Sequence, residues 1–200
     1  MLDKKSDIAA NIGSRICHDL ISPIGAISNG LELLELSGIP QTPEMILIAD
    51  SVRAANAKVR FLRITFGDAS GDGAIGISEI ADILAHYYGN GRLNVKWHVD
   101  TPLSRKDLKL CFLTLMCLEN TLPYGGTIAV SDHGDGWQFE AIGDQVKTED
   151  VIDLASQRFY VSNGSSTVQY SITQMMLSDG GYKIRFTQAE NNLSVLITSQ

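Results

Sequence analysis

The sequence predicts an α+β protein in which an N-terminal helical hairpin is followed by an α/β sandwich. Three observations lead to this fold class. Apolar residues recur every three or four positions up to residue 66, as they do on one face of a helix. A stretch rich in Gly, Asp and Ser over 67–76 is typical of a linker. From residue 78 onward, helical and strand-like segments alternate. We therefore predict a helical domain over residues 1–68 and an α/β domain over residues 77–200.

The first segment is predicted to be one long amphipathic helix. Ser6 is expected to cap its start, and Gly38 suits the left-handed position past its end. Pro23 lies inside it, where the missing backbone hydrogen bond favours a bend. The apolar positions of this helix are Ile8, Ile12, Ile16, Leu20, Ile24, Ile27, Leu31 and Leu34.

A second helix is predicted to begin at Thr42 and Pro43, a capping residue followed by proline at the first helical position. The connection of about five residues is short enough to make the two helices antiparallel. One hairpin encloses little apolar surface, so we expect two copies to form a four-helix bundle as a homodimer. The apolar positions of the second helix are Met45, Ile48, Val52, Ala55, Val59, Leu62 and Phe66.

The second part is predicted to place helices on one face of a mixed sheet. Ser104 begins the helix with the clearest buried stripe, and turns over 133–136 and 190–192 join two strand hairpins. The expected helices span 78–88, 104–121, 148–158 and 167–178, and the expected strands span 93–99, 127–131, 137–142, 182–186 and 193–198.

Composition excludes several classes of function. The net charge is −7, and all of it belongs to residues 67–200, because residues 1–66 hold seven basic and seven acidic side chains. An acidic chain is a poor general binder of nucleic acid. The sequence contains no apolar run of membrane-spanning length and no signal peptide. Three cysteines without a CxxC motif, and four histidines outside any cluster with them, favour a cytosolic protein with reduced thiols and no zinc.

His18 is the most informative residue. It lies about 160° around the helix from both Ile16 and Leu20, so it faces away from the apolar positions and toward solvent. Arg15, one turn earlier, is placed to hold an anionic phosphoryl group. Asp19 is placed to fix the imidazole tautomer or to accept a proton. A lone surface histidine most often has no chemical role, so the assignment depends on the residues around it.

Residues 17–24, CHDLISPI, resemble the phosphoacceptor box of sensor histidine kinases, with matches at the histidine, acid, leucine, small polar and proline positions. The second part resembles the ATP-binding domain of these kinases in the order of its elements. It departs from their nucleotide motifs, since Glu119 and Asn120 keep at most part of one box and Pro123 follows them. No glycine follows Asp144, and the glycine-rich lid is reduced to SNGSS over 162–166. Because glycines allow close approach of the backbone to a triphosphate, we expect no ATP binding.

Both parts together resemble the ChpT-type histidine phosphotransferases over 6–198, most clearly at SRICHDLISP (14–23) and NGLELL (29–34). The resemblance implies a homodimer that passes phosphoryl groups between the receiver domain of a hybrid kinase and response regulators. It also implies that the second domain helps to dock the receiver. The Mg²⁺ ion would belong to the receiver, so no cofactor is expected.

His18 is then the phosphoacceptor, assisted by Asp19 and Arg15. The predicted partner contacts are Ser14, Ser22, Gly25 and Ala26 near His18 and Arg158 in the second domain; the segment around Arg158 is equally consistent with a core position. Arg53, Arg60 and Arg63 are candidate rim contacts or simply solvated charges. Two other functions stay open: an ATP-dependent sensor-kinase core, and a non-catalytic dimeric adaptor that binds receivers.

Overall fold

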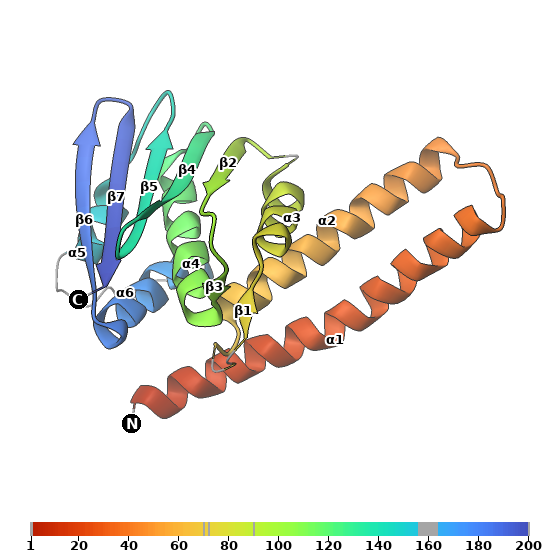
Figure 1. Ribbon diagram of the computed structural model, residues 1–200, viewed down its shortest axis with the longest axis horizontal. Helices are drawn as coiled ribbons and strands as arrows, with labels where there is room; N and C mark the ends of the chain where they lie inside the picture. The colour runs from red at the N-terminus through yellow and green to blue at the C-terminus, as the bar shows by residue number, and fades with distance from the viewer. Residues whose placement is uncertain (1, 70, 72, 90, 156–163, 200) are drawn as a thin grey trace.

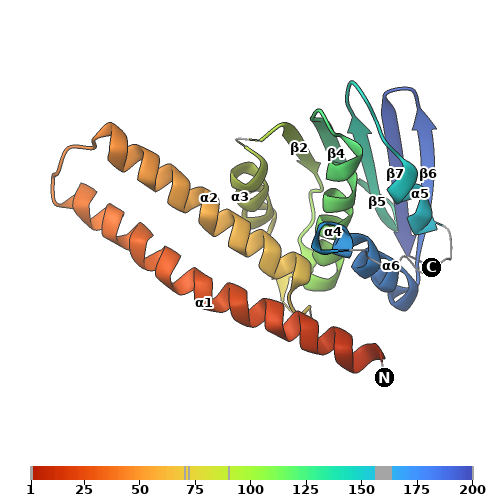
Figure 2. The same ribbon diagram turned by 180° about the vertical axis from the view of Figure 1, so that it is seen from behind.

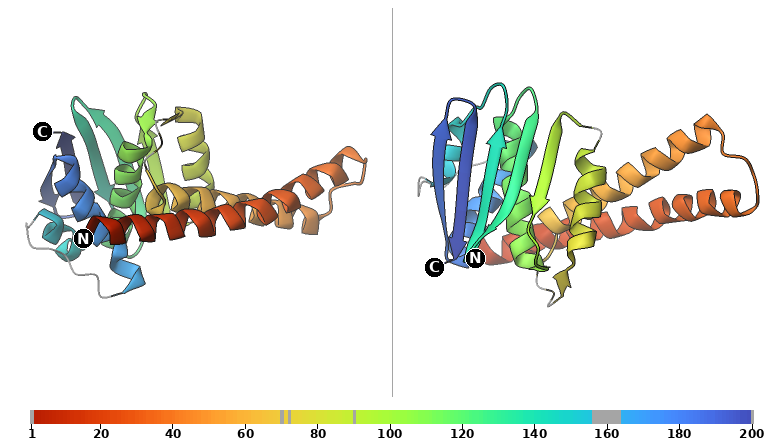
Figure 3. Two further views of the ribbon diagram at one scale, coloured as in Figure 1. Left: turned by 90° about the horizontal axis from the view of Figure 1, so that it is seen from below. Right: turned by 45° about the horizontal axis from the view of Figure 1, so that its top comes forward.

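The computed structural model describes residues 2–69, 71, 73–89, 91–155 and 164–199. A long hairpin of helices α1 (Leu2–Leu36) and α2 (Pro43–Phe66) projects from an α/β unit formed by the rest of the chain (Figure 1). Where the hairpin meets the α/β unit, α2 packs against α3 and α4, while α1 packs against α2 (Figure 3). The predicted α+β class and the antiparallel hairpin are confirmed.

The ends of the hairpin helices follow local signals with one exception. Thr42 caps α2, since its Oγ1 accepts a hydrogen bond from the amide of Met45 at 3.3 Å. Gly38 has φ of +74°, the left-handed conformation expected past the end of α1. The expected cap at Ser6 is wrong, because α1 begins at Leu2 and continues without interruption through Pro23.

The two hairpin helices pack only partly through the predicted apolar positions of α1. Buried Cys17 and half-buried Ile21 and Ile24 lie on the side that faces α2. A neighbouring strip of α1 stays 40–55% exposed in the single chain. We call it the apolar stripe; it comprises Ile12, Ile16, Leu20, Ile27 and Leu34.

The α/β unit contains a five-stranded sheet with the order β2-β4-β5-β7-β6, in which β2 is parallel to β4 and all other neighbours are antiparallel. The strands are β2 (Leu93–His98), β4 (Gly126–His133), β5 (Gly136–Ile142), β6 (Tyr182–Ala189) and β7 (Asn192–Ser199). The helices are α3 (Ile77–Tyr88), α4 (Arg105–Thr121), α5 (Glu149–Ala155) and α6 (Val168–Gly180), with a short 3₁₀ turn η1 (Ser165–Thr167) before α6.

These elements agree with the predicted segments, apart from small shifts of their ends. Ser104, predicted as the first residue of this helix, is instead its cap, and its Oγ accepts a hydrogen bond from the amide of Asp107. Two short strands were not predicted: β1 (Ala74–Ile75), inside the expected linker, pairs with β3 (Leu103–Ser104). The expected helix over 148–158 is described only as far as Ala155.

Helices cover one face of the sheet, as Figure 2 shows with α4, α5 and α6 in front of the strands. Ile128, Phe139 and Val195 point from adjacent strands into the core between the sheet and α4, and all three are fully buried. The other face carries polar side chains such as Lys96, Gln138 and Arg185. This alternation is the one expected for a sheet with one covered face.

The core of the α/β unit extends into the hairpin. Phe61 of α2 is fully buried and stacks between Tyr87 of α3 and Phe112 of α4, with ring centroids 4.0 and 4.5 Å away. Arg60 of α2 pairs with Glu79 at 3.0 Å and Asp82 at 2.8 Å, both on α3. Side-chain packing therefore crosses the division between 1–68 and 77–200 that the sequence predicts.

Candidate functional site

His18 lies on the outer surface of α1, on the side away from the apolar stripe, with a side chain that is 73% exposed. Its Nδ1 lies 3.3 Å from Oδ1 of Asp19. An ionised carboxylate only accepts hydrogen bonds, so in this contact Nδ1 carries the proton. Nε2 of the neutral imidazole then keeps its lone pair and points to solvent, which is the arrangement of an accessible nucleophile.

Asp19 joins His18 to Arg15. Nε of Arg15 donates to Oδ2 of Asp19 at 2.9 Å, across one turn of the helix. The hydrogen bond from Arg15, followed by the one from His18, lowers the pKa of the Asp19 carboxyl, so Asp19 is ionised at neutral pH. Within the described chain, the two terminal nitrogens of Arg15 make no other ion pair and face solvent beside His18.

The other residues predicted near His18 divide into two groups. Ser22 and Ala26 are exposed on the same side of α1 as His18. Gly25 is half-buried, and a Cβ added there would meet nothing within 4 Å, so packing within this chain does not require glycine. Ser14 is half-buried, and its Oγ accepts a hydrogen bond from the amide of Asp68 at 2.9 Å. Arg158 lies outside the described residues.

The structure also shows a connection that the sequence analysis missed. Nζ of Lys109, on α4, donates to the carbonyl oxygen of Gly67 at 2.6 Å, and the adjacent Asp68 amide reaches Ser14 on α1. Burial lowers the pKa of the Lys109 ammonium, and the nearby Asp68 carboxylate opposes this shift. The α/β unit is thereby tied to the turn of α1 that precedes His18. No local pattern predicts these contacts, which join positions 42 and 54 residues apart.

Residues at the kinase-like positions of the second part lie at the end of α4 and beyond β5. Asn120 and Asp144 are exposed, whereas Glu119 is half-buried. Burial raises the pKa of the Glu119 carboxyl, and the Arg92 guanidinium opposes this shift. Residues 162 and 163 of the expected lid lie outside the described residues, and 165–167 form η1.

The three cysteines are buried and free, as expected. Burial raises the pKa of the Cys17 thiol despite the opposing charge of Arg63, so this neighbour of His18 is a packing residue rather than a reactive thiolate. Among the residues that the structure describes, no group of three His, Cys, Asp or Glu side chains is positioned to hold a metal ion. The described helices include none that is long and apolar enough to cross a membrane.

Comparisons with known proteins show which family the chain belongs to. Residues 77–192 match the family model described as the histidine phosphotransferase C-terminal domain. The chain is 38% identical over 130 residues to the protein phosphotransferase ChpT of Brucella abortus (strain 2308), a match covering 64% of this chain and 62% of that protein. The chain is also similar to a solved bacterial phosphotransferase, with 28% identity, coverage of 92% of both chains and a TM-score of 0.65.

Proposed function

Because the chain belongs to the histidine phosphotransferase family, we propose that it relays phosphoryl groups through His18 between aspartates of receiver domains. The donor is the receiver of a hybrid kinase, and the acceptors are response regulators. One observation carries this proposal: His18 is exposed, and Asp19 binds its Nδ1, which leaves Nε2 free to react.

In the forward step, Nε2 of His18 attacks the phosphorus of the receiver's acyl phosphate in line. The bond between phosphorus and the receiver carboxylate breaks, and the aspartate leaves as a carboxylate. The ring keeps its proton on Nδ1 and becomes positively charged, and the ionised Asp19 stabilises this charge. The phosphohistidine then transfers its phosphoryl group to a second receiver by the reverse step.

Arg15 neutralises charge on the phosphoryl group during transfer. Its bond to Asp19 fixes the guanidinium beside His18, and its remaining nitrogens are available to phosphoryl oxygens. Such reactions depend mainly on positioning and charge stabilisation rather than on further covalent chemistry of the protein. Ser22, Gly25 and Ala26 give a surface of small side chains next to His18 where a receiver helix fits closely.

We propose that this chain needs neither a nucleotide nor a metal of its own, the Mg²⁺ ion being supplied by the receiver. Pro123 follows the exposed Asn120, and no glycine follows Asp144, so the residues that hold nucleotide in a kinase are incomplete. Calorimetry with ATP and Mg²⁺ tests this, and micromolar binding would instead favour a sensor-kinase core.

We propose further that two chains pair through the apolar stripe to form a four-helix bundle. The stripe runs along α1 on the side away from His18, so pairing leaves the histidine accessible. Ile16→Glu is expected to yield a monomer in light scattering coupled to gel filtration. Leu33→Glu, at an exposed leucine outside the stripe, is the matched control and should remain dimeric.

A cytoplasmic location fits this role. Receiver domains act there, and the three buried, free cysteines suit a reducing compartment.

The decisive experiment follows labelled phosphate from a phosphorylated receiver to this protein. The native chain should gain an acid-labile label, and His18→Gln should gain none. His133→Gln, at an exposed histidine of β4, is the control and should transfer normally. Label on the His18→Gln protein would overturn the assignment. Receiver binding by the native chain without any phosphohistidine would show a non-catalytic adaptor.

A further inference from the structure

A short network of hydrogen bonds joins α1 to α4 through the two residues that follow α2. The amide of Asp68 donates to Oγ of Ser14 at 2.9 Å, and Nζ of Lys109 donates to the carbonyl oxygen of Gly67 at 2.6 Å. We call these four residues the Ser14–Lys109 network. Gly67 is buried between the two bonds, and Ser14 and Lys109 are half-buried. The network therefore connects three separate segments of the chain at one place.

The backbone around this network is closely packed. A Cβ added to Gly67 would lie 2.9 Å from Oγ of Ser14. A Cβ added to Gly13 would lie 3.2 Å from the carbonyl oxygen of Phe66. Both distances are shorter than an ordinary van der Waals contact, so the two glycines allow α1 to approach the end of α2 more closely than other residues would.

The network holds α1 one turn before His18. Residues four apart on a helix lie on the same side, so Ser14 and His18 share the side of α1 that faces away from the apolar stripe. Helix α1 packs against α2 and makes at most isolated contacts with the described helices and strands of the α/β unit. Apolar burial has no preferred direction, whereas a hydrogen bond requires a defined angle. The bond to Ser14 therefore fixes the rotation of the turn that precedes His18.

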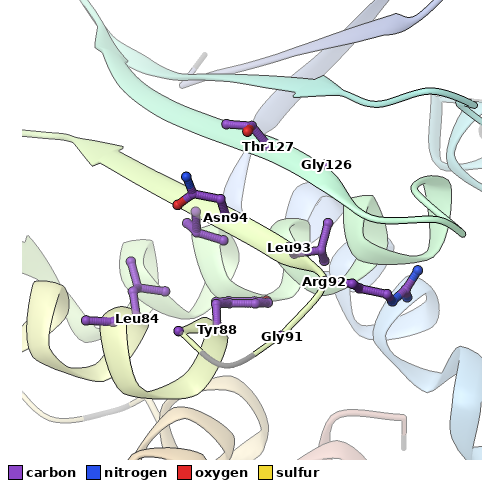
Figure 4. A pocket seen from close by; sticks show the side chains of 11 residues that line it. Leu84, Tyr88, Gly91, Arg92, Leu93, Asn94, Gly126 and Thr127 are labelled. Carbon is purple, nitrogen blue, oxygen red and sulfur yellow. The ribbon is translucent and has the colours of Figure 1, made fainter.

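The hollow between α3 and β2 does not provide such a connection. It has a volume of about 380 Å³, and the residues that line it all belong to the α/β unit, among them Leu84, Arg92 and Asn94 (Figure 4). None of the lining residues comes from α1. The Ser14–Lys109 network, rather than this hollow, links the α/β unit to the helix that carries His18.

A small rotation of α1 is enough to disturb phosphoryl transfer. A side-chain atom about 6 Å from the axis of a helix moves by about 1 Å when the helix rotates by about 10°. In-line displacement requires aligned reacting atoms, and a misplacement of about 1 Å can slow a reaction about a hundredfold. The orientation of His18 therefore affects the rate of transfer even when a receiver is already bound.

We propose that Ser14 and Lys109 are positioning residues for phosphotransfer. Through Gly67 and Asp68 they fix the rotation of α1, and this directs Nε2 of His18 toward the bound receiver. The inference rests on the proposed function of His18. It gives Ser14 a role inside the chain instead of a contact with the partner, and it gives Lys109 of α4 a part in a reaction that takes place on α1.

The test measures transfer of labelled phosphate from a phosphorylated receiver at several receiver concentrations. Ser14→Ala and Lys109→Met should each lower kcat about three- to tenfold, as expected for the loss of one hydrogen bond, and leave KM nearly unchanged. Because both variants break the same network, the double variant should be no slower than the slower single variant. Ser14→Thr and Lys109→Arg keep the hydrogen-bonding groups and should restore kcat.

Two control variants separate positioning from a general loss of contacts. Ser37→Ala removes the bond from Oγ of Ser37 to the carbonyl oxygen of Leu33, at the far end of α1, and should leave kcat unchanged. Lys106→Met, on the same helix as Lys109, removes the ammonium that lies 5.9 Å from the ring centre of Tyr182, and it should also leave kcat unchanged. Labelling by phosphoramidate, a small donor that needs no docking, should proceed at the native rate in every variant.

A second measurement does not use the relay. Amide hydrogen exchange, followed by mass spectrometry, should become faster over residues 9–20 in Ser14→Ala and in Lys109→Met, because α1 opens more readily once the network is broken. Exchange over β5 should stay as in the native chain.

Three results would overturn the proposal. A raised KM with an unchanged kcat in Ser14→Ala would show that Ser14 contacts the receiver, and a native kcat in Lys109→Met would show that the network has no role in transfer. Additive losses in the double variant, or native exchange over residues 9–20 in both single variants, would also contradict it. A native chain that takes no label from the phosphorylated receiver would instead refute the proposed function, and the exchange rates would then decide whether the network holds α1.

Discussion

Replacing Phe61 with alanine measures how strongly the hairpin is built into the α/β core. Phe61 is fully buried, and truncating a buried phenylalanine to alanine costs about 3–5 kcal/mol. Its ring stacks on both Tyr87 and Phe112, and each such pair contributes about 0.5–1.5 kcal/mol beyond the buried area. The expected loss therefore lies at the upper end of this range, a large part of the roughly 5–15 kcal/mol that stabilises a typical domain.

The assay is urea unfolding followed by two signals. Trp97 and Trp137 both lie in the α/β unit, and Trp97 contacts Phe112 edge-on, so tryptophan fluorescence reports on that core. Far-UV circular dichroism reports strongly on the long hairpin helices. Leu47→Ala, at a 68% exposed residue of the same helix, is the control and should change stability by no more than about 0.5 kcal/mol. If Phe61→Ala left the fluorescence midpoint where Leu47→Ala leaves it, the shared core would be refuted.

Three further predictions concern charged groups. Asp19→Asn should slow label transfer from a phosphorylated receiver about tenfold or more, because the ion pair with Arg15 and the negative charge beside the imidazole are lost. An unchanged rate would contradict the mechanism. Lys109→Met should lower the free energy of unfolding by about 1–2 kcal/mol, because the bond to the Gly67 carbonyl is lost, and a urea midpoint equal to that of the native chain would contradict this. Burial raises the folded-state pKa of Glu119, so the folded chain binds more protons than the unfolded chain between the two pKa values. The contribution of Glu119 to the free energy of unfolding therefore falls as the pH rises from about 4.5 through the raised pKa. Glu119→Gln should therefore gain stability relative to the native chain over that interval in paired urea titrations, and the opposite trend would refute the shift.

The elements that the sequence predicted well are those governed by nearby residues. Thr42 caps α2 through an amide three positions away, and Gly38 supplies the left-handed backbone that ends α1. The error at Ser6 is also local. Nothing before Ser6 stops a helix, and the leucine and lysines there are good helix formers, so the helix continues back to Leu2.

Elements that depend on distant pairing were missed or shortened. β1 consists of two residues that form a strand only because Ile75 pairs with Leu103. β4 extends to His133, past the predicted end, because its last residues pair with Gly136 and Trp137 of β5. A two-residue strand and a polar strand end are both too short, or too polar, to show the alternation of apolar residues from which a strand is predicted.

The period of the helices, the cap at Thr42, the helix end at Gly38, and the position of His18 opposite the apolar positions of α1 could all be predicted from the sequence. Each of these follows from helix geometry within a few residues. Which apolar surface is covered depends on contacts between distant segments: α2 packs on the side of Cys17, the apolar stripe stays exposed, and Phe61 enters the second core. The same holds for the link from Lys109 to Gly67. These features arise between segments far apart in the chain, and periodicity describes one segment at a time.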